Sequence, residues 1–177
     1  PYYGDSAGLG VVHRMVARTG RALPDFAAVG PGDIVYLTYD ANRDHLIVSD
    51  TSPAVWDVDL RTHQGTRLFD APSSSNMTMS FDSATQRLLF AYEGSTFDEY
   101  TLEGKLVHTC AGIALPHVVT ISGGVTSDTQ QPAIAGLVAT GDGLIYAQSE
   151  DQRTVYRIDR ACHVLTAFTH QFFNEAP

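Results

Sequence analysis

The sequence predicts an all-β chain built from repeated four-stranded antiparallel units. One observation is that the apolar pattern returns after about 42 residues, a period typical of repeat proteins. The second is that each repeat holds four short runs rich in Val, Ile, Leu, Tyr and Phe, bounded by Asp, Asn, Gly, Ser or Pro. The third is that no stretch shows the 3.6-residue periodicity of an amphipathic helix.

The repeat is clearest between the segments that begin at Ile34 and Asn76. Met79 lies 42 residues after Leu37, and apolar positions then match through three successive predicted strands. The further matched pairs are Tyr39 with Phe81, Asp40 with Asp82, Leu46 with Leu88, Val48 with Phe90, Val58 with Tyr100, and Leu60 with Leu102. For Asp40 and Asp82 we expect turn capping, in which a short side-chain acceptor binds nearby backbone N–H groups.

A third copy begins at Ile134, where Leu137 matches Leu37. The alignment pairs Leu144 and Tyr146 with Leu46 and Val48, after a first turn two residues shorter, and Tyr156 and Ile158 with Trp56 and Val58. Length changes confined to turns are what loops tolerate. From this alignment we expect Trp56, Tyr100, Tyr146 and Tyr156 to lie on buried faces between units.

The predicted organisation has five parts. Residues 1–33 form half a unit made of outer strands, because residues 11–17 form a strand-like run and Gly20 falls where Gly104 falls two repeats later. Full units cover residues 34–75, 76–111 and 134–177. Residues 112–133 are an insertion, because a link between consecutive units needs only a few residues.

A period near 42 residues with four strands per unit favours β-propeller blades over a solenoid or a sandwich. About three and a half blades do not close a ring, since propellers have about four to eight, and open sheet edges are avoided in folded proteins. We therefore expect the chain to be part of a larger ring. The missing blades come from sequence outside this chain, from another chain, or from blades not recognised in the pattern.

Two short patterns carry a resemblance to known families. Residues 46–50 read Leu-Ile-Val-Ser-Asp, residues 54–59 read Ala-Val-Trp-Asp-Val-Asp, and residues 156–159 repeat the second pattern as Tyr-Arg-Ile-Asp. In this the chain resembles the NHL-type and WD-repeat propellers, although it lacks the Gly-His pair of WD repeats and has Trp-Asp once. The resemblance implies the propeller fold and its usual role as a binding platform, and it implies no functional residues.

Composition excludes several classes of partner. The formal net charge is −9, and the basic residues are scattered, so nucleic-acid binding is disfavoured. No apolar run approaches the roughly 20 residues of a membrane span. Cys110 and Cys162 are expected to be two free, mostly buried thiols, because they fall at different blade positions. The compartment is undetermined, with an intracellular location slightly favoured.

The sequence holds no catalytic set, and we predict neither a cofactor nor a bound metal. There is no Gly-x-Ser-x-Gly elbow, no P-loop, and none of the seven histidines is paired at zinc-site spacing. Propellers similar to gluconolactonase hold a divalent ion on the channel axis. The candidates here are Asp50, Glu93 and Glu150, which we interpret as solvated loop carboxylates.

The function predicted from sequence is a non-catalytic propeller module that acts as a protein–protein interaction scaffold within a larger protein or complex. The alternative is a propeller hydrolase or lyase with an axial divalent ion. The expected partner is another protein or the remaining blades of the same propeller. The predicted partner-binding residues are the apolar side chains and the histidine of the insertion's first half: Ile113, Leu115, His117, Val119 and Ile121.

Overall fold

The structure is a computed structural model that describes residues 2–4, 10–24, 27–28, 32–71, 78–92, 94–115, 133–149 and 154–169. In these ranges every regular element is a β-strand. The described residues therefore contain no helix long and apolar enough to span a membrane. The strands form four antiparallel sheets, three of them four-stranded. The fold class predicted from sequence, all-β with four-stranded antiparallel units, is confirmed.

Each sheet is assembled from strands that are consecutive in sequence. The N-terminal sheet contains β1 (Tyr2–Gly4), β2 (Val11–Arg14) and β3 (Ala27–Ala28). The first sheet contains β4 (Ile34–Asp40), β5 (His45–Asp50), β6 (Ala54–Asp59) and β7 (Gln64–Asp70). The second contains β8 (Thr78–Asp82), β9 (Arg87–Ala91), β10 (Phe97–Tyr100) and β11 (Leu106–Cys110). The third contains β12 (Ile134–Ala139), β13 (Ile145–Ser149), β14 (Thr154–Ile158) and β15 (Val164–Thr169).

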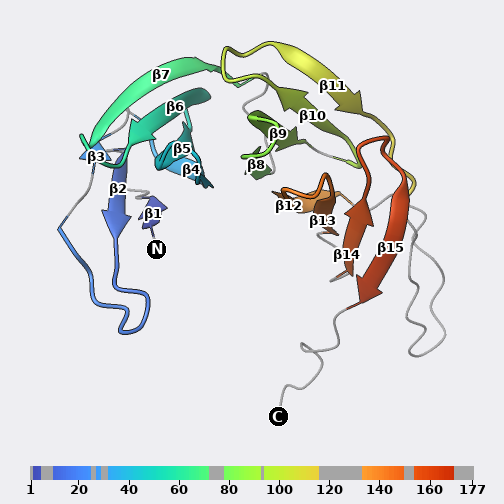
Figure 1. Cartoon of the computed structure of the whole chain (residues 1–177), viewed down its shortest axis with the longest axis horizontal. Helices are drawn as coiled ribbons and strands as arrows, with labels where there is room; N and C mark the ends of the chain where they lie inside the picture. The colour runs from blue at the N-terminus through green and yellow to red at the C-terminus, as the bar shows by residue number, and fades with distance from the viewer. Residues whose placement is uncertain are drawn as a thin grey trace.

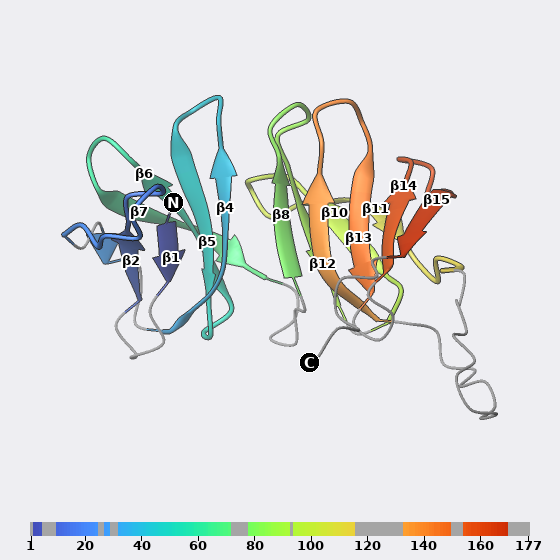
Figure 2. The same ribbon diagram turned by 90° about the horizontal axis from the view of Figure 1, so that it is seen from below.

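The sheets stand side by side along an arc (Figure 1). The first strands β4, β8 and β12 line its concave side, and the last strands β7, β11 and β15 form its outer rim. Seen from below, β4, β8 and β12 run alongside one another (Figure 2), and β8 contacts both β4 and β12. All five residues of β8 are buried because a sheet covers it on either side.

In the first two sheets the 42-residue repeat holds at the level of strand register. Leu37 faces Val48 across β4 and β5, and Met79 faces Phe90 in the same way across β8 and β9. The sequence predicts a hairpin in the N-terminal region. There Met15 and Ala22 form an antiparallel bridge, and Gly20, in the turn between them, has a φ of 65°. A further strand, β1, pairs with the other edge of β2.

For the second strand of the third copy, the register predicted from sequence is wrong by one residue. Ala139 faces Ile145, just as Tyr39 faces Leu46, so Ile145 and Ala147 occupy the positions that were assigned to Leu144 and Tyr146. The first turn is therefore one residue shorter than in the first sheet, not two. Because side chains alternate along a strand, the shift moves Tyr146 to the opposite face, where it is half-buried.

Apolar clusters fill the spaces between neighbouring sheets. One cluster joins the first and second sheets through residues such as Ile47, Phe81 and Phe90, and another joins the second and third sheets. Val58, Tyr156 and Ile158 are fully buried, Tyr100 is 8% exposed, and Trp56 is partly buried. Phe69, Phe90 and Tyr100 meet with ring centroids 5.8 to 6.3 Å apart.

The expectation of two free thiols is wrong, because Cys110 and Cys162 form a disulfide. Cys110 ends β11 on the rim of the second sheet, and Cys162 lies in the β14–β15 turn of the third sheet. Their Cα atoms are 5.5 Å apart, within the range of a native disulfide. The two cysteines occupy different blade positions, which predicts no pairing within one repeat, but the disulfide joins the strand end of one sheet to a turn of the next.

Candidate functional site

A group of interacting polar and sulfur-bearing side chains lies at the junction of the second and third sheets. Arg160 extends from the β14–β15 turn and donates to Glu99 Oε1 at 2.7 Å and to Asp82 Oδ2. Glu99 belongs to β10, and Asp82 ends β8. Both carboxylates are at least nine-tenths buried, so a guanidinium from the third sheet neutralises acids held by the second.

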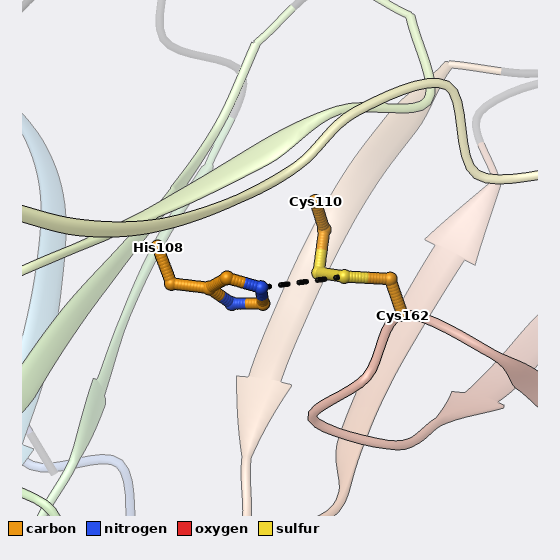
Figure 3. A group of neighbouring side chains, drawn as sticks. All are labelled: His108, Cys110 and Cys162. Atoms are coloured by element: carbon orange, nitrogen blue, oxygen red, sulfur yellow. Dashed lines mark hydrogen bonds between the residues drawn. A yellow bond between two sulfur atoms is a disulfide. The ribbon is translucent and has the colours of Figure 1, made fainter.

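His108 of β11 connects this ion-pair network to the disulfide. Its Nδ1 atom is 3.9 Å from Glu99 Oε1, and its Nε2 atom is 3.8 Å from Cys162 Sγ. Figure 3 shows the imidazole directed toward the two sulfur atoms. One potential ligand atom from each of His108, Cys110 and Cys162 lies within 4.8 Å of the other two. The repeat pattern does not predict this group, because Cys110 and Cys162 fall at different positions of two repeats and are 52 residues apart.

The repeat alignment gives the place of Cys162 but not its partner. Cys162 occupies the turn position that Gly104 occupies in the second sheet, and each N–H bonds the carbonyl three residues earlier. Both residues have a positive φ, 68° for Cys162 and 80° for Gly104. Asp44, His63 and Gln86 also have a positive φ in other turns, so the alignment of a cysteine with a turn glycine marks where the side chain lies and does not by itself indicate a disulfide.

The predicted partner-binding residues divide into two groups. Ile113 and Leu115 are 3% and 5% exposed and pack into the core between the second and third sheets, so the chain itself covers them. His117, Val119 and Ile121 lie outside the described residues. The partner contact proposed for the insertion therefore rests on the residues beyond Leu115.

Both described ends of the insertion are fixed to one loop of the second sheet. The backbone N–H of Ile113 donates to Ser95 O, and the N–H of Ile134 donates to Gly94 O, each at 3.0 Å. Gly112 N also donates to Thr96 Oγ1 at 3.3 Å. The insertion thus begins and ends beside the β9–β10 loop.

Of the three carboxylates considered for an axial metal, only Asp50 lies in the described part of the chain. It is 5% exposed, and its oxygens accept from Ser52 N, Ala54 N and Trp56 Nε1 at 2.9 to 3.2 Å. Asp50 therefore organises the β5–β6 loop inside its own sheet, which corrects its interpretation as a solvated carboxylate. Glu93 and Glu150 lie outside the described residues.

The outward face of the third sheet, meaning the face turned away from the second sheet, differs from the corresponding face of the other sheets. In the first and second sheets that face packs on the next sheet along the chain. In the first sheet this face carries Ile47 and Val55, and in the second it carries Leu89 and Phe97; all four are fully buried by the next sheet. The equivalent residues of the third sheet, Tyr146 and Val155, are only half-buried. Beside them Val138 is 56% exposed and Phe168 is 49% exposed.

Comparison with known proteins supports the architecture. No family model matches the chain, and neither does any curated protein. A chain in the crystal structure of a nidogen/laminin complex superposes with a TM-score of 0.65 at 12% identity, covering 92% of this chain and 59% of that one. Virginiamycin B lyase from Staphylococcus aureus superposes with a TM-score of 0.60 at 12% identity, covering 98% of this chain and 53% of that one.

The chain has a β-propeller-like fold. It spans between half and three-fifths of the length of these two neighbours. The first, second and third sheets are blades of this fold, with β4, β8 and β12 as the inner strands. At 12% identity the likeness establishes the fold and not the activity.

Proposed function

We propose that the chain is a non-catalytic propeller module that acts as a protein–protein interaction scaffold. The observation that carries the proposal is the outward face of the third sheet. Apolar residues occupy the same positions there that the next sheet buries elsewhere in the chain. Val138 and Phe168 are 56% and 49% exposed on this face, with Gln148 and Arg157 between them. Exposed apolar groups on a folded protein are a common feature of protein-interaction sites. The nidogen/laminin complex, which contains a structural neighbour, is itself an assembly of proteins.

The occupant we propose for this face is a propeller sheet of a partner protein. A sheet of the same protein is the other outcome of the test, in which the crosslink joins two peptides of one chain and the scaffold proposal loses its support. The two junctions inside the chain share one interaction: Thr38 Oγ1 accepts from Phe81 N, and Ser80 Oγ accepts from Ala139 N, each at 3.1 Å. Val138 holds the equivalent place in the third sheet and has no side-chain acceptor. The contact made by this face is therefore apolar at that point.

The test is a photo-crosslinking amino acid placed at Val138, with the same substitution at Val107 as the matched control. Val107 is 45% exposed on the outer strand β11, whereas Val138 faces the proposed partner. We expect a protein adduct from position 138 and none from 107, mapped to a β-sheet partner by mass spectrometry. Adducts that are absent from 138, or equal from both positions, would refute the proposal.

The insertion is proposed as a second contact with a partner, supported by its fixed base on residues 94–96. Binding residues are often carried by loops that a rigid scaffold positions. Deletion of residues 122–131, closed by a short Gly-Ser link, is expected to leave the sheets folded by circular dichroism and to abolish capture of the main partner. A folded deletion variant that retains every partner would show the insertion to be a plain linker.

The alternative function is a propeller hydrolase or lyase with a divalent ion on the channel axis. Its support is the similarity in fold to virginiamycin B lyase. Asp50 is a poor candidate ligand, because its carboxylate oxygens already accept hydrogen bonds from its own sheet. Calorimetric titration of the oxidised protein with Ca²⁺ separates the two proposals, because submicromolar binding would favour the enzyme over the scaffold.

A further inference from the structure

Three potential metal ligands, His108, Cys110 and Cys162, converge where the second and third sheets meet. Cys162 has a φ of 68° in a turn where the second sheet uses Gly104. His63 has a φ of 62° in the corresponding turn of the first sheet, so the backbone of this turn accepts a side chain, and the disulfide partner accounts for the cysteine. The disulfide leaves the placement of His108 unexplained.

The position of His108 fits a zinc ligand. Zn–S and Zn–N bonds of about 2.3 and 2.0 Å at a tetrahedral centre place sulfur and nitrogen about 3.6 Å apart. The Nε2 atom of His108 is already 3.8 Å from Cys162 Sγ. The second sulfur, Cys110 Sγ, belongs to the same group of atoms within 4.8 Å. Opening the disulfide has to separate the two sulfurs to about 3.8 Å, the spacing of two thiolates on one zinc ion.

The surroundings also suit a metal site. Histidine ligands commonly have a carboxylate near the second ring nitrogen, and Glu99 Oε1 is 3.9 Å from His108 Nδ1. Arg160 fixes Glu99 at 2.7 Å and lies two residues before Cys162 in the same turn.

We propose that reduction of the Cys110–Cys162 disulfide creates a site for a borderline-soft divalent cation of the Zn²⁺ class. A dithiol reductant supplies two electrons and two protons, the S–S bond breaks, two thiols form, and the reductant becomes a disulfide. The cation then displaces both thiol protons and binds Cys110 Sγ, Cys162 Sγ and His108 Nε2, with a water in the fourth position. The second and third sheets are thereby joined by a covalent bond when oxidised and by a metal ion when reduced.

The structure allows this exchange. Cys162 lies in a partly exposed turn at the rim, on the solvent side of the bond, whereas Cys110 is 1% exposed. The ligands come from two sheets that also share an apolar core, including Leu89 and Ile145. This core holds the sheets together while the sulfur atoms are reduced.

Cobalt(II) is the probe, because its spectrum reports both coordination geometry and sulfur ligation. The full chain is reduced with a phosphine, which is oxidised to its phosphine oxide, and is then titrated anaerobically. We expect one equivalent to give visible bands of tetrahedral Co²⁺ and a near-ultraviolet thiolate-to-metal band, both bleached by Zn²⁺. The oxidised protein is expected to give neither band.

The matched variants are His108→Ala and His163→Ala. His163 is adjacent to Cys162 but 75% exposed, and it pairs with Asp159 on its own turn. We expect His108→Ala to weaken Co²⁺ binding at least tenfold, in line with the loss of a ligand, and His163→Ala to leave binding unchanged. Equal affinity in the parent and His108→Ala would overturn the proposal.

Folding is followed on the same samples by circular dichroism and thermal melting. We expect Zn²⁺ to raise the melting temperature of the reduced parent and to leave that of the reduced Cys110→Ser variant unchanged. A reduced parent that shows no sulfur-to-cobalt band overturns the proposal, whether that protein is folded or unfolded, because the site requires both sheets in place.

Discussion

At the scale of single residues, buried carboxylates decide how the turns close and how the sheets are joined. Asp40 and Asp82 each end the first strand of a sheet, and their Oδ1 atoms accept from the N–H of Asn42 and Ala84 at 3.0 Å. The turn capping predicted from their shared repeat position is confirmed. Their second oxygens differ in role, because Asp40 binds Arg43 of its own turn whereas Asp82 binds Arg160 of the next sheet.

Asp40 is expected to make stability depend on pH in the acid range. Burial acts to raise its pKa, but hydrogen bonds from Arg43 and Asn42 outweigh burial and hold the pKa below its ordinary value. The stabilisation is therefore complete above the unfolded-state pKa, about 3.9, and is lost as pH falls through the lower folded-state pKa. Urea unfolding should show the free-energy gap between the parent and Asp40→Asn shrinking below about pH 4. Asp70→Asn, 58% exposed in its side chain, should show little gap at any pH.

Replacing Arg160 by methionine should destabilise the chain strongly. The variant leaves Asp82 and Glu99 buried without their cation, a change that costs about 3 kcal/mol or more. Arg61→Met is the control, because the Arg61 side chain is 87% exposed, and it should change the unfolding free energy by less than about 0.5 kcal/mol. Similar values for both variants in urea unfolding would mean that the junction does not depend on this ion pair.

At the scale of elements, the outer hairpins of the second and third sheets each dock on the rim of the preceding sheet. The β10–β11 turn places Gly104 against Phe69 of β7, and the β14–β15 turn places Cys162 against Cys110 of β11. One turn position thus serves two purposes: glycine permits close approach at one junction, and cysteine makes a covalent bond at the next. Repetition of backbone geometry permits different chemistry at equivalent places.

The substitutions Gly104→Ala and Gly143→Ala separate close packing from backbone strain. Both glycines have a positive φ, 80° and 85°, so an added Cβ strains each backbone by about 1 kcal/mol. At Gly104 the Cβ would also lie 2.7 Å from Phe69 Cγ, whereas nothing lies within 4 Å at Gly143. Gly104→Ala should therefore lower the unfolding free energy by about 1 to 3 kcal/mol more than Gly143→Ala. Equal losses would mean that Phe69 moves aside freely.

At the scale of the whole molecule, the chain is an arc of sheets held by their faces and not a single closed core (Figure 1). Each inner junction buries apolar side chains from two sheets, and the third sheet carries a similar face with its apolar groups exposed. Stability at this scale depends on how firmly neighbouring sheets are joined. The disulfide is the covalent part of that connection.

Removing the disulfide by the double variant Cys110→Ala/Cys162→Ala should lower the unfolding free energy by about 4 kcal/mol. The estimate follows from releasing a loop with a sequence separation of 52 in the unfolded chain. Reductant without added metal should destabilise the parent to a comparable degree and leave the double variant unaffected. An unchanged melting temperature in the double variant would show that the apolar junction alone holds the third sheet.

The sequence by itself determined the architecture, because the period, the alternation of apolar residues and the turn chemistry are local properties. Matched positions such as Leu37 and Met79 correctly predicted the strand register of the first and second sheets. The match of Asp40 with Asp82 correctly predicted the turn caps. The register of the third sheet was missed by one residue because Leu144 and Ile145 are both apolar, so the pattern did not choose between them.

Only the tertiary structure decided which residues meet across a junction. Cys110 and Cys162, His108 and Glu99, and Arg160 and Asp82 come from different strands or sheets, and no periodicity within one repeat relates their positions. The same holds for Ile113 and Leu115, whose apolar character indicated a buried surface without indicating whether the chain itself or a partner buries it. Contacts of this kind depend on the packing of one sheet on the next, which the repeat pattern implies in outline but does not specify residue by residue.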